Sequence, residues 1–321
     1  MRPDTILVTG ASGLIGHALA SRLQAEGRNV IGLDRRPPRA GRASFPFVEA
    51  ELNDVHRLYA AVRGREPAGI VHCGGVSGLM VARDNPFLIC QTNILGTAHV
   101  LELARLVKAC RVIFCSSISA YGHQEVDGVV TEDTPMRGRT TYGASKIAGE
   151  AILQAYAEEH GVGGIALRFT HVYGPGRETQ CFVRAMIEDA LARRASHLPH
   201  ARRARRQYVY VTDVVDAIVL ALDAEAPPRR AYNVGSGRQH RLGEVADAVR
   251  SVIGPLDVAF DDACDPLEYT CGTLDISAAG RELAWRPKID LNAGIAAYAE
   301  FLRAFYGSTQ PPSTTIVWPV M

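Results

Sequence analysis

The feature that most constrains the fold is a glycine-rich turn near the N-terminus, TGASGLIG at residues 9–16. It follows the strand-like residues 5–8 directly and opens a helical pattern over residues 14–26, which is the context that such a turn requires. At this spacing Gly10 permits a tight turn, Gly13 lets backbone N–H groups approach a pyrophosphate, and Gly16 lets helix and strand pack closely. We therefore expect a dinucleotide site whose contacts here are Gly10, Gly13, Leu14, Ile15 and Gly16.

Short apolar runs alternate with helical patterns through the first half of the chain. The runs lie at residues 30–33, 69–73, 112–115 and 165–169, and a long helical pattern covers residues 89–108. Continuous apolar strands separated by helices indicate βαβ units and a sheet that is buried on both faces. The sequence predicts an α/β fold with a Rossmann-type, doubly wound parallel sheet.

The second half is less regular and predicts a smaller, mixed substrate-binding region at the C-terminal side. Helical patterns, one alternating strand and a polar, basic loop follow one another at residues 181–193, 197–206, 208–211, 213–223, 242–253 and 292–305. We expect an NAD-binding domain at residues 1–170 and a substrate-binding region at residues 171–306 that is partly interleaved with it. Residues 307–321 read as a loose tail.

The composition is that of an ordinary soluble chain. Of 321 residues, 35 are basic and 34 acidic, so the net charge of +1 gives no reason to expect a nucleic acid or a membrane surface as partner. No apolar run approaches the ~20 residues of a membrane span, and the N-terminus lacks a signal-peptide pattern. The seven cysteines form no CxxC pair and no zinc-type cluster, so we expect no metal and reduced thiols in a cytoplasmic protein.

A carboxylate at the end of the second apolar strand points to the choice of cofactor. Asp34 lies about 20 residues after the glycine turn, where an acid accepts hydrogen bonds from an adenosine ribose and repels a 2′-phosphate. This favours NAD. Arg35, a predicted cofactor contact, and Arg36 leave NADP as the alternative, because arginines can hold that phosphate.

A tyrosine and a lysine four residues apart form the candidate proton-transfer pair. In the run YGASK, a helix would place Tyr142 and Lys146 on one face, where the ammonium stabilises a phenolate. Such a tyrosine can take a proton from a sugar or alcohol hydroxyl. On spacing alone the pair is weak, since solvated helices often carry both residues.

The order of these and further motifs resembles an extended short-chain dehydrogenase/reductase of the NAD-dependent epimerase/dehydratase family, from about residue 5 to residue 305. The resemblance rests on the glycine turn, Glu51-Leu52, His72-Cys73-Gly74-Gly75, Asn93, Ser116-Ser117, YGASK, Leu167-Arg168, Val172-Tyr173-Gly174-Pro175, Arg206-Gln207-Tyr208 with Asp213, Tyr232-Asn233-Val234-Gly235 and Leu283-Ala284-Trp285-Arg286-Pro287. It implies NAD, hydride transfer at a hydroxyl of a small sugar-type substrate, and a homodimer built from two helices per subunit, here at residues 89–108 and 142–160.

The resemblance also implies roles for single residues. Ser117 matches the serine that binds the reacting oxygen, Tyr142 the acid/base and Lys146 the holder of the nicotinamide ribose. Asn93 matches a site near the active centre, although capping of the adjacent helix is an equal alternative. Further implied cofactor contacts are Glu51, Leu52, Gly74, Ser116 and Phe169.

Departures from the family pattern narrow the chemistry. Dehydratases and decarboxylases of the family carry an acid just after the catalytic serine, whereas this chain has Ile118. Epimerases of UDP-sugars place a phosphate-binding asparagine where this chain has His171. A protonated histidine could replace it, and a neutral one could serve as a donor to a smaller substrate. Residues 257–269 carry no arginine where many relatives hold a diphosphate.

Anion contacts are predicted from the arginines that remain. Arg206 could grip a phosphate or carboxylate together with its neighbours in the loop at residues 202–206, although Arg202 and Arg203 read better as solvated. Arg177 and Arg184 are weaker candidates for an anion site, and the sequence favours a surface position for each of them. The predicted substrate contacts are Ser117, His171, Arg177 and Arg206.

The sequence supports three hypotheses for the function. The motif order favours a sugar or nucleotide-sugar epimerase. His171 and the missing arginine motivate a net NAD-dependent dehydrogenase of a small sugar, sugar acid or related hydroxy compound. The third hypothesis is a non-catalytic NAD-binding sensor, which the retained Tyr142 and Lys146 argue against.

Overall fold

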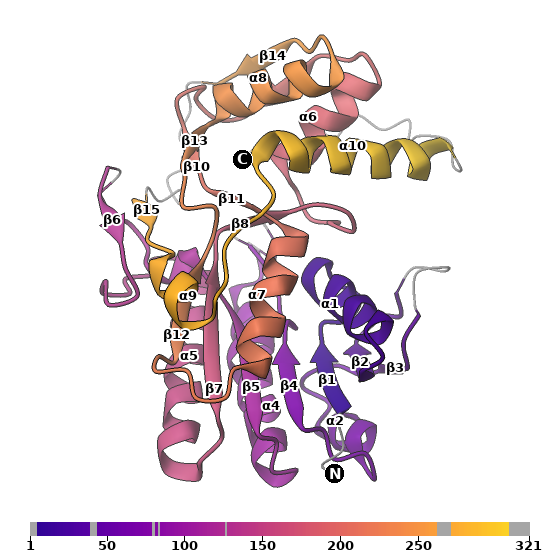
Figure 1. Ribbon diagram of the computed structural model, residues 1–321, viewed down its shortest axis with the longest axis vertical. Coiled ribbons are helices and arrows are strands. Elements are labelled where there is room, and N and C mark those ends of the chain that lie inside the picture. The colour runs from indigo at the N-terminus through magenta and orange to yellow at the C-terminus, as the bar shows by residue number, and fades with distance from the viewer. Residues whose placement is uncertain are drawn as a thin grey trace.

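A parallel sheet forms the centre of the molecule (Figure 1). Within the residues that the computed structural model describes, 5–38, 44–78, 81–82, 84–125, 127–261 and 271–307, this sheet has seven strands in the order β12-β7-β5-β4-β1-β2-β3. All neighbouring strands pair in parallel. Their bounds are β1 (Thr5–Thr9), β2 (Asn29–Asp34), β3 (Phe47–Glu49), β4 (Gly69–His72), β5 (Arg111–Ser117), β7 (Gly164–Phe169) and β12 (Ala231–Val234). The Rossmann-type prediction is confirmed, and β1 lies at the switch point where such sheets bind ligands.

Helices cover both faces of this sheet, which explains why its strands read as unbroken apolar runs. On β1, Ile6 and Val8 pack into one core with the helices α1 (Leu14–Ala25) and α7 (Val211–Asp223). Leu7 points to the opposite face and packs into a second core. That core is closed by α2 (Val55–Val62), α4 (Gly96–Leu106) and α5 (Thr141–His160).

A smaller, mixed region lies above the carboxyl ends of the strands (Figure 1). Its helices are α6 (Phe182–Leu191), α8 (Leu242–Ile253) and α10 (Leu291–Gly307), and its short strand pairs are β8 (His171–Tyr173) with β11 (Tyr208–Tyr210), β9 (Ser196–Leu198) with β14 (Val258–Phe260) and β10 (Arg205–Arg206) with β13 (His240–Arg241). The chain returns from this region to the sheet through α7 and β12, so the two predicted regions share one core. The predicted tail beyond Gly307 lies outside the described residues.

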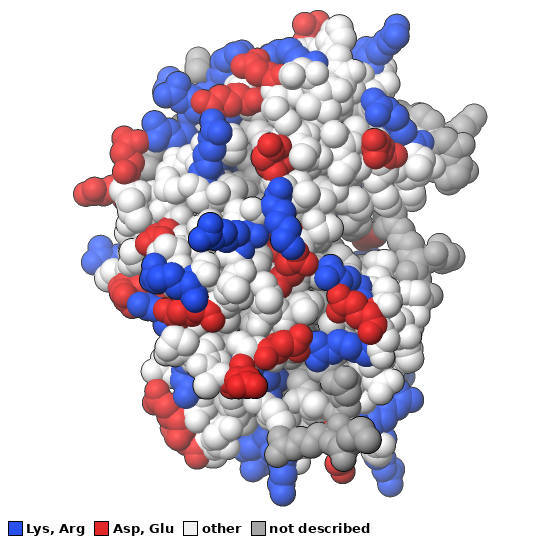
Figure 2. Space-filling view, viewed as in Figure 1, with Lys and Arg blue, Asp and Glu red and all other residues white. Residues whose placement is uncertain are grey.

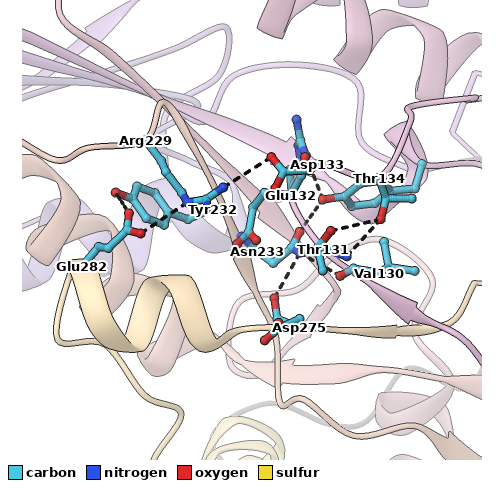
Figure 3. A network of polar contacts seen from close by, with 12 residues as sticks. Val130, Thr131, Glu132, Asp133, Thr134, Arg229, Tyr232, Asn233, Asp275 and Glu282 are labelled. Atoms are coloured by element: carbon cyan, nitrogen blue, oxygen red, sulfur yellow. Dashed lines mark hydrogen bonds and ion pairs between the residues drawn. The ribbon is translucent and has the colours of Figure 1, made fainter.

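A polar network fastens β12 to the segments beside it (Figure 3). The Asn233 side chain donates to the carbonyls of Val130 and Asp275, 3.1 Å each, and its backbone N–H donates to Glu132 at 2.8 Å. Asp275 lies between β15 (Thr273–Leu274) and α9 (Ser277–Glu282), and β15 pairs with β6 (Val129–Val130). Asn233 is fully buried, so these bonds satisfy a polar group that burial would otherwise destabilise.

Three local expectations were wrong. The helix expected at residues 89–108 begins earlier, where Asn85 accepts from the Leu88 N–H and caps α3 (Pro86–Cys90). It then passes through a π-helical turn, η1 (Gln91–Leu95), before α4. The loop expected at residues 197–206 contains parts of β9 and β10. The strands β3 and β12 were missed, because β3 has only three residues and the apolar run of β12 is interrupted by Asn233.

Charged side chains of both signs are interspersed on the face shown in Figure 2. Ion pairs near the protein surface include Arg22 with Asp216 at 3.2 Å and Lys288 with Asp216 at 2.7 Å. The mixture agrees with the near-zero net charge of the sequence.

Candidate active site

A cleft of about 1860 Å³ runs from the carboxyl ends of the central strands into the smaller region. Every site residue that the sequence predicted lines this cleft, with the single exception of Asn93. The strand ends of β1, β2, β4, β5 and β7 form its floor, as expected for a doubly wound sheet.

The glycine turn lies close to the loop that comes after β4. Gly10 has φ +69°, and a Cβ atom there would come within 2.6 Å of the Gly74 nitrogen. A Cβ on Gly74 would meet Leu52 and the Thr9 hydroxyl at 3.1 Å. Gly13 begins α1, and no side chain of the described residues caps the helix there, so its first N–H groups can bind an anion in the cleft.

The end of β2 is tied to the same turn. The Asp34 carboxylate accepts a 3.0 Å hydrogen bond from the Ser12 N–H, and the Ser12 hydroxyl donates to the Arg36 carbonyl at 2.6 Å. Asp34 is half-buried in the cleft wall, whereas Arg35 and Arg36 are exposed. The Asp34 carboxylate, which favours NAD, is therefore held more firmly than the two arginines, which could favour NADP.

Behind the loop after β4 lies a directed chain of hydrogen bonds. The Thr97 hydroxyl donates to the Asn93 carbonyl at 2.5 Å, so its oxygen accepts from His72 Nε2 at 3.0 Å. His72 Nδ1 then accepts from the Thr9 hydroxyl at 2.7 Å, and Thr9 accepts from the Gly74 N–H at 3.2 Å. A carbonyl can only accept, so the Asn93 end fixes the direction through Thr97 to His72, and burial keeps His72 neutral so that its Nδ1 accepts from Thr9. The chain holds Gly74 at the cleft wall and requires a neutral His72.

Burial, together with the charge of Lys146, lowers the pKa of His72 to about 3. This folded-state pKa lies below the unfolded value of about 6.5, so the stabilisation from neutral His72 is complete above that pH and is lost as pH falls towards 3. We expect the free energy of unfolding to fall over this window by up to ~1.4 kcal/mol per pH unit from His72 alone. In His72→Gln this part of the slope should vanish, as urea titrations at several pH values would measure. The exposed His160→Gln is the control, and an unchanged slope in His72→Gln would refute the assignment.

Asn93 lies one layer behind the cleft. Its side chain accepts from the Val76 N–H at 2.8 Å and donates to the Val76 carbonyl and to the Ser145 hydroxyl, 3.0 Å each. It is 3% exposed and belongs to the π-helical turn, so the alternative that it caps a helix is wrong. Asn93 links the loop after β4 to the helix that carries Tyr142, which is an indirect role in the site.

Ser117 and the start of α5 are brought together by close backbone packing. The Ser117 hydroxyl accepts from the Ser119 N–H at 3.1 Å and donates to the Ser119 hydroxyl at 3.2 Å. Thr140 caps α5 by accepting from the Gly143 N–H at 3.0 Å. A Cβ atom on Gly143 would lie only 2.5 Å from the Ser119 carbonyl oxygen. The glycine thus lets the serine turn press against the helix that presents Tyr142 to the cleft.

Lys146 lies one helical turn beyond Tyr142 and on the same side of α5, as predicted. Its Nζ is 5.7 Å from the centre of the Tyr142 ring and donates a 2.8 Å hydrogen bond to the Cys115 carbonyl. The side chain is 8% exposed, so the ammonium is fixed in position and weakly screened by water. The structure therefore places a fixed cation beside the half-buried phenol of Tyr142, as the predicted proton-transfer pair requires.

A buried ion pair supports this arrangement from below. Arg168 on β7 binds the Glu150 carboxylate with Nε and with Nη2, the latter at 2.7 Å. The Ser116 hydroxyl, next to Ser117, donates to the same carboxylate at 2.5 Å. Arg168 also donates to the Tyr121 hydroxyl at 2.8 Å. The network joins β5, α5 and β7 just behind Ser117 and Lys146.

His171 lines the cleft in a neutral form. Burial, followed by the charges of Arg206 and Arg177, lowers its pKa to about 3. Its Nδ1 lies 3.2 Å from the Gln207 carbonyl and must donate to it, which leaves Nε2 as a hydrogen-bond acceptor. The protonated, phosphate-binding form does not fit this environment, and the neutral form would accept from a ligand rather than donate to it.

The arginines gather at the end of the cleft away from the sheet. Arg177 donates to the carbonyls of Val172 and Gln180, and Arg184 binds Glu188 at 2.7 Å. Both are half-buried cleft residues, so the surface alternative for them is wrong, whereas Arg202 and Arg203 are indeed exposed. The arginines lining this end are Arg177, Arg184, Arg194, Arg205, Arg206 and Arg303.

Sequence reasoning missed several lining residues. Arg303 lies on α10, outside all of the motifs, so nothing in the sequence marked it as a residue of the cleft. Tyr208 stood in a quoted motif but had no role assigned. Among the described residues its buried hydroxyl finds no hydrogen-bond partner, and Tyr208 lines the cleft, where a ligand could supply one. Of the segment without arginine, residues 257–261 are described and carry Asp261, which pairs with His197 at 2.8 Å, while residues 262–269 lie outside the described part.

Comparison with known proteins places this geometry in context. Residues 6–235 match the family described as the NAD dependent epimerase/dehydratase family. A UDP-glucose 4-epimerase of Mycolicibacterium smegmatis is 32% identical over 311 residues, covering 92% of this chain and 98% of the relative.

Solved structures of similar fold cover nearly the whole chain as well. A UDP-glucose 4-epimerase of Thermotoga maritima, with UDP-glucose, superposes with a TM-score of 0.88 at 25% identity and covers 94% of this chain and 99% of its own. MoeE5, in complex with UDP-glucose and NAD, gives a TM-score of 0.85 at 28% identity with the same coverage of both chains.

Proposed function

The chain belongs to the NAD dependent epimerase/dehydratase family, and we propose that it is an NAD-dependent epimerase of a nucleotide-diphosphate sugar. The observation that carries the proposal is the single cleft shared by the glycine turn, the Ser117–Tyr142–Lys146 group and an arginine-rich far end. The cleft volume of about 1860 Å³ suits a cofactor and a nucleotide-sugar together. UDP-glucose, which the relatives' names and complexes contain, is the first candidate substrate.

The residues present fit NAD. The cradle formed by Gly10 and Gly74 has no room for side chains, α1 offers N–H groups to a pyrophosphate, and Asp34 offers a carboxylate to a ribose. When bound, NAD supplies a reversible acceptor for the hydride of a sugar carbon.

The chain's own residues handle the proton. Tyr142, in its phenolate form, takes the proton from the sugar hydroxyl as the carbon is oxidised, and Lys146 lies beside the ring to stabilise that phenolate before the transfer. The Ser117 hydroxyl holds the same oxygen and stabilises charge that develops on it. Tyr142 returns the proton once the sugar presents its other face, so substrate and product differ only in configuration.

Elimination chemistry is disfavoured by the residue next to Ser117. This residue, Ile118, is 5% exposed and packs in a small apolar cluster with Tyr121 and Val130. Within the described lining of the cleft, the acids are Asp34, Glu51, Glu178 and Glu188, and none belongs to the segments that carry Ser117 and Tyr142. A dehydratase would need an acid or base beside the reacting carbon.

A net dehydrogenase of a smaller hydroxy compound is the second candidate. His171 favours it, because a neutral Nε2 acceptor suits a hydroxyl better than a phosphate. The test is the absorbance of NADH during turnover. An epimerase leaves the cofactor unchanged, whereas NADH that accumulates with the consumed alcohol would replace the epimerase proposal with this one.

Asp34→Ala tests the choice of cofactor. We expect NAD binding to weaken about tenfold or more, because a hydrogen bond to a charged group contributes about 1.5–3 kcal/mol, while NADP binding weakens less or improves. Calorimetric titration with both nucleotides measures the ratio. Glu49→Ala is the matched control, since Glu49 pairs in register with Asp34 on β3 but does not line the cleft. A ratio unchanged in Asp34→Ala would contradict the role of this carboxylate.

The homodimer and the cytoplasmic location are also part of this proposal. Within the described residues, Pro86–Leu106 is long and apolar enough to cross a membrane by length and composition, contrary to the expectation from the sequence, and 44% of its apolar window is buried. Exposed apolar side chains lie along it, namely Phe87, Leu95 and Leu106 at 68%, 47% and 51% exposure. A second copy that packs on this face would cover them, as in a bundle of two helices per subunit.

Sedimentation velocity tests the dimer. We expect the unmodified chain to sediment as a dimer and a Phe87→Asp, Leu106→Asp double variant to sediment as a monomer, because two charges would lie in an apolar interface. A monomer at all concentrations in the unmodified chain would refute the homodimer.

A further inference from the structure

Two cysteines meet at the floor of the cleft. Cys73 directly follows β4 and Cys115 lies in β5, and the register that pairs His72 with Phe114 brings the next two positions side by side. Their sulfur atoms are 3.3 Å apart. Both line the cleft between the glycine turn and Lys146. We propose that Cys73 and Cys115 are an oxidisable dithiol, which a peroxide converts into an intramolecular disulfide when the cleft holds no cofactor.

The backbone geometry permits the bond. Neighbouring strands of a sheet lie about 4.8 Å apart. This spacing falls within the ~4.4–6.8 Å between Cα atoms that disulfides span. A bond of about 2.05 Å therefore needs the sulfurs to approach by little more than ~1 Å, which rotation of the side chains can supply. The strand pairing on β4 and β5 does not have to change.

The cleft gives the reagent access. Cys73 is half-buried and reaches the cleft, while Cys115 is 6% exposed and lies behind it. The hydrogen bond from Cys115, followed by burial, raises the pKa of Cys73, so its thiol reacts more slowly than an activated one. We therefore expect Cys73 to be modified slowly and at this one site, and not to act as a catalytic thiol.

The chemistry balances in two steps. The Cys73 thiol, after losing its proton, attacks one oxygen of hydrogen peroxide, the O–O bond breaks, and sulfenic acid and water result. The Cys115 sulfur then attacks the Cys73 sulfur and displaces the hydroxyl as a second water. The two thiols lose two electrons and two protons in total, and the peroxide takes up both and becomes two waters.

A disulfide between Cys73 and Cys115 would shift the backbone segments that position the catalytic groups. Lys146 donates to the Cys115 carbonyl, and Ser116 and Ser117 follow Cys115 directly. On the other strand, Cys73 precedes the Gly74 that approaches the glycine turn. We therefore expect the oxidised protein to lose NAD affinity and turnover, and both to return after reduction.

The experiment treats the full-length chain with hydrogen peroxide in two forms, stripped of nucleotide and saturated with NAD. Remaining thiols are alkylated under denaturing conditions, and intact mass and peptide mapping are then measured. The stripped protein should carry two alkyl groups fewer than the reduced protein and, after correction for alkylation, be lighter by two hydrogen atoms. It should yield one linked peptide that joins Cys73 to Cys115, and dithiothreitol should reverse the link. NAD should slow the linkage, because bound nucleotide covers both thiols.

Two variants sharpen the result. Cys73→Ser should give no linked peptide and leave Cys115 open to alkylation. Cys110→Ser, which removes an exposed thiol elsewhere, should form the Cys73–Cys115 link as the unmodified chain does. The proposal is overturned if the stripped protein gives no such link, or if Cys73→Ser loses the same mass.

The expectation that NAD slows the linkage rests on the proposed cofactor site. The formation of the Cys73–Cys115 disulfide does not depend on that proposal. Binding of NAD is measured separately by calorimetry. A link that forms equally fast in protein shown to hold NAD overturns the cofactor-dependent part of the proposal. Failure to bind NAD at all counts against the proposed function and leaves the linkage result to stand alone.

Discussion

Tyr142→Phe is expected to lower kcat by about 10²–10⁴-fold, the contribution of a positioned general acid–base. The substitution removes one hydroxyl from the cleft and keeps the ring beside Lys146, so the cation remains in place. NAD affinity should change little, because the glycine turn and Asp34 carry most of the proposed nucleotide contacts. Initial rates with UDP-glucose and a calorimetric NAD titration measure the two quantities separately.

Tyr156→Phe is the matched control for this prediction. Tyr156 lies on the same helix α5, but its hydroxyl reaches Glu102 at 3.4 Å and the residue does not line the cleft. Its loss should leave kcat unchanged. Full turnover in Tyr142→Phe would remove Tyr142 from the mechanism, whereas an equal loss in both variants would mean that the helix, and not the hydroxyl, had been disturbed.

Arg168→Met is expected to destabilise the fold by ~3–5 kcal/mol, the usual cost of removing one partner from a buried ion pair. Arg168 and Glu150 are 5% and 8% exposed, so the substitution leaves a carboxylate without its partner in the core. Desolvation alone would lower the pKa of Arg168, but the hydrogen bonds and charge of Glu150 raise it above its usual value. Urea unfolding at neutral pH measures the change.

A double variant separates the buried charge from general damage to packing. Arg168→Met with Glu150→Leu should recover much of the lost stability, since no uncompensated charge stays buried. Arg229→Ala removes a half-exposed arginine that pairs with Glu282 at 3.3 Å and should have a far smaller effect. A double variant less stable than Arg168→Met would contradict the account of this pair.

The parts of the site that the sequence predicted are those that local spacing determines. The glycine turn is contiguous, and its need for small residues is a local steric fact that the approach of Gly10 to Gly74 bears out. Tyr142 and Lys146 share a helix, so four residues of spacing fix their common face. The strands of the sheet are apolar on both faces, which made β1, β2, β4, β5 and β7 visible as continuous runs.

The parts that the sequence could not predict depend on contacts between distant segments. Arg303 reaches the cleft only because α10 packs beside α6. Asn93 lies behind the cleft because it belongs to a π-helical turn, which the hydrophobic periodicity of the sequence did not predict. The state of His171 depends on Gln207, on two arginines and on burial, and Cys73 and Cys115 meet only through the register of β4 and β5.

The most direct test of the central claim tracks the hydrogen on the carbon that is oxidised. UDP-glucose that carries deuterium at C4 is incubated with the purified protein and NAD, and the products are read by NMR and mass spectrometry. We predict a C4 epimer that retains the deuterium, with no net NADH, because the hydride leaves and returns within one cleft while Tyr142 handles the proton. Deuterium that collects in NADH, or that is lost to solvent, would contradict the account.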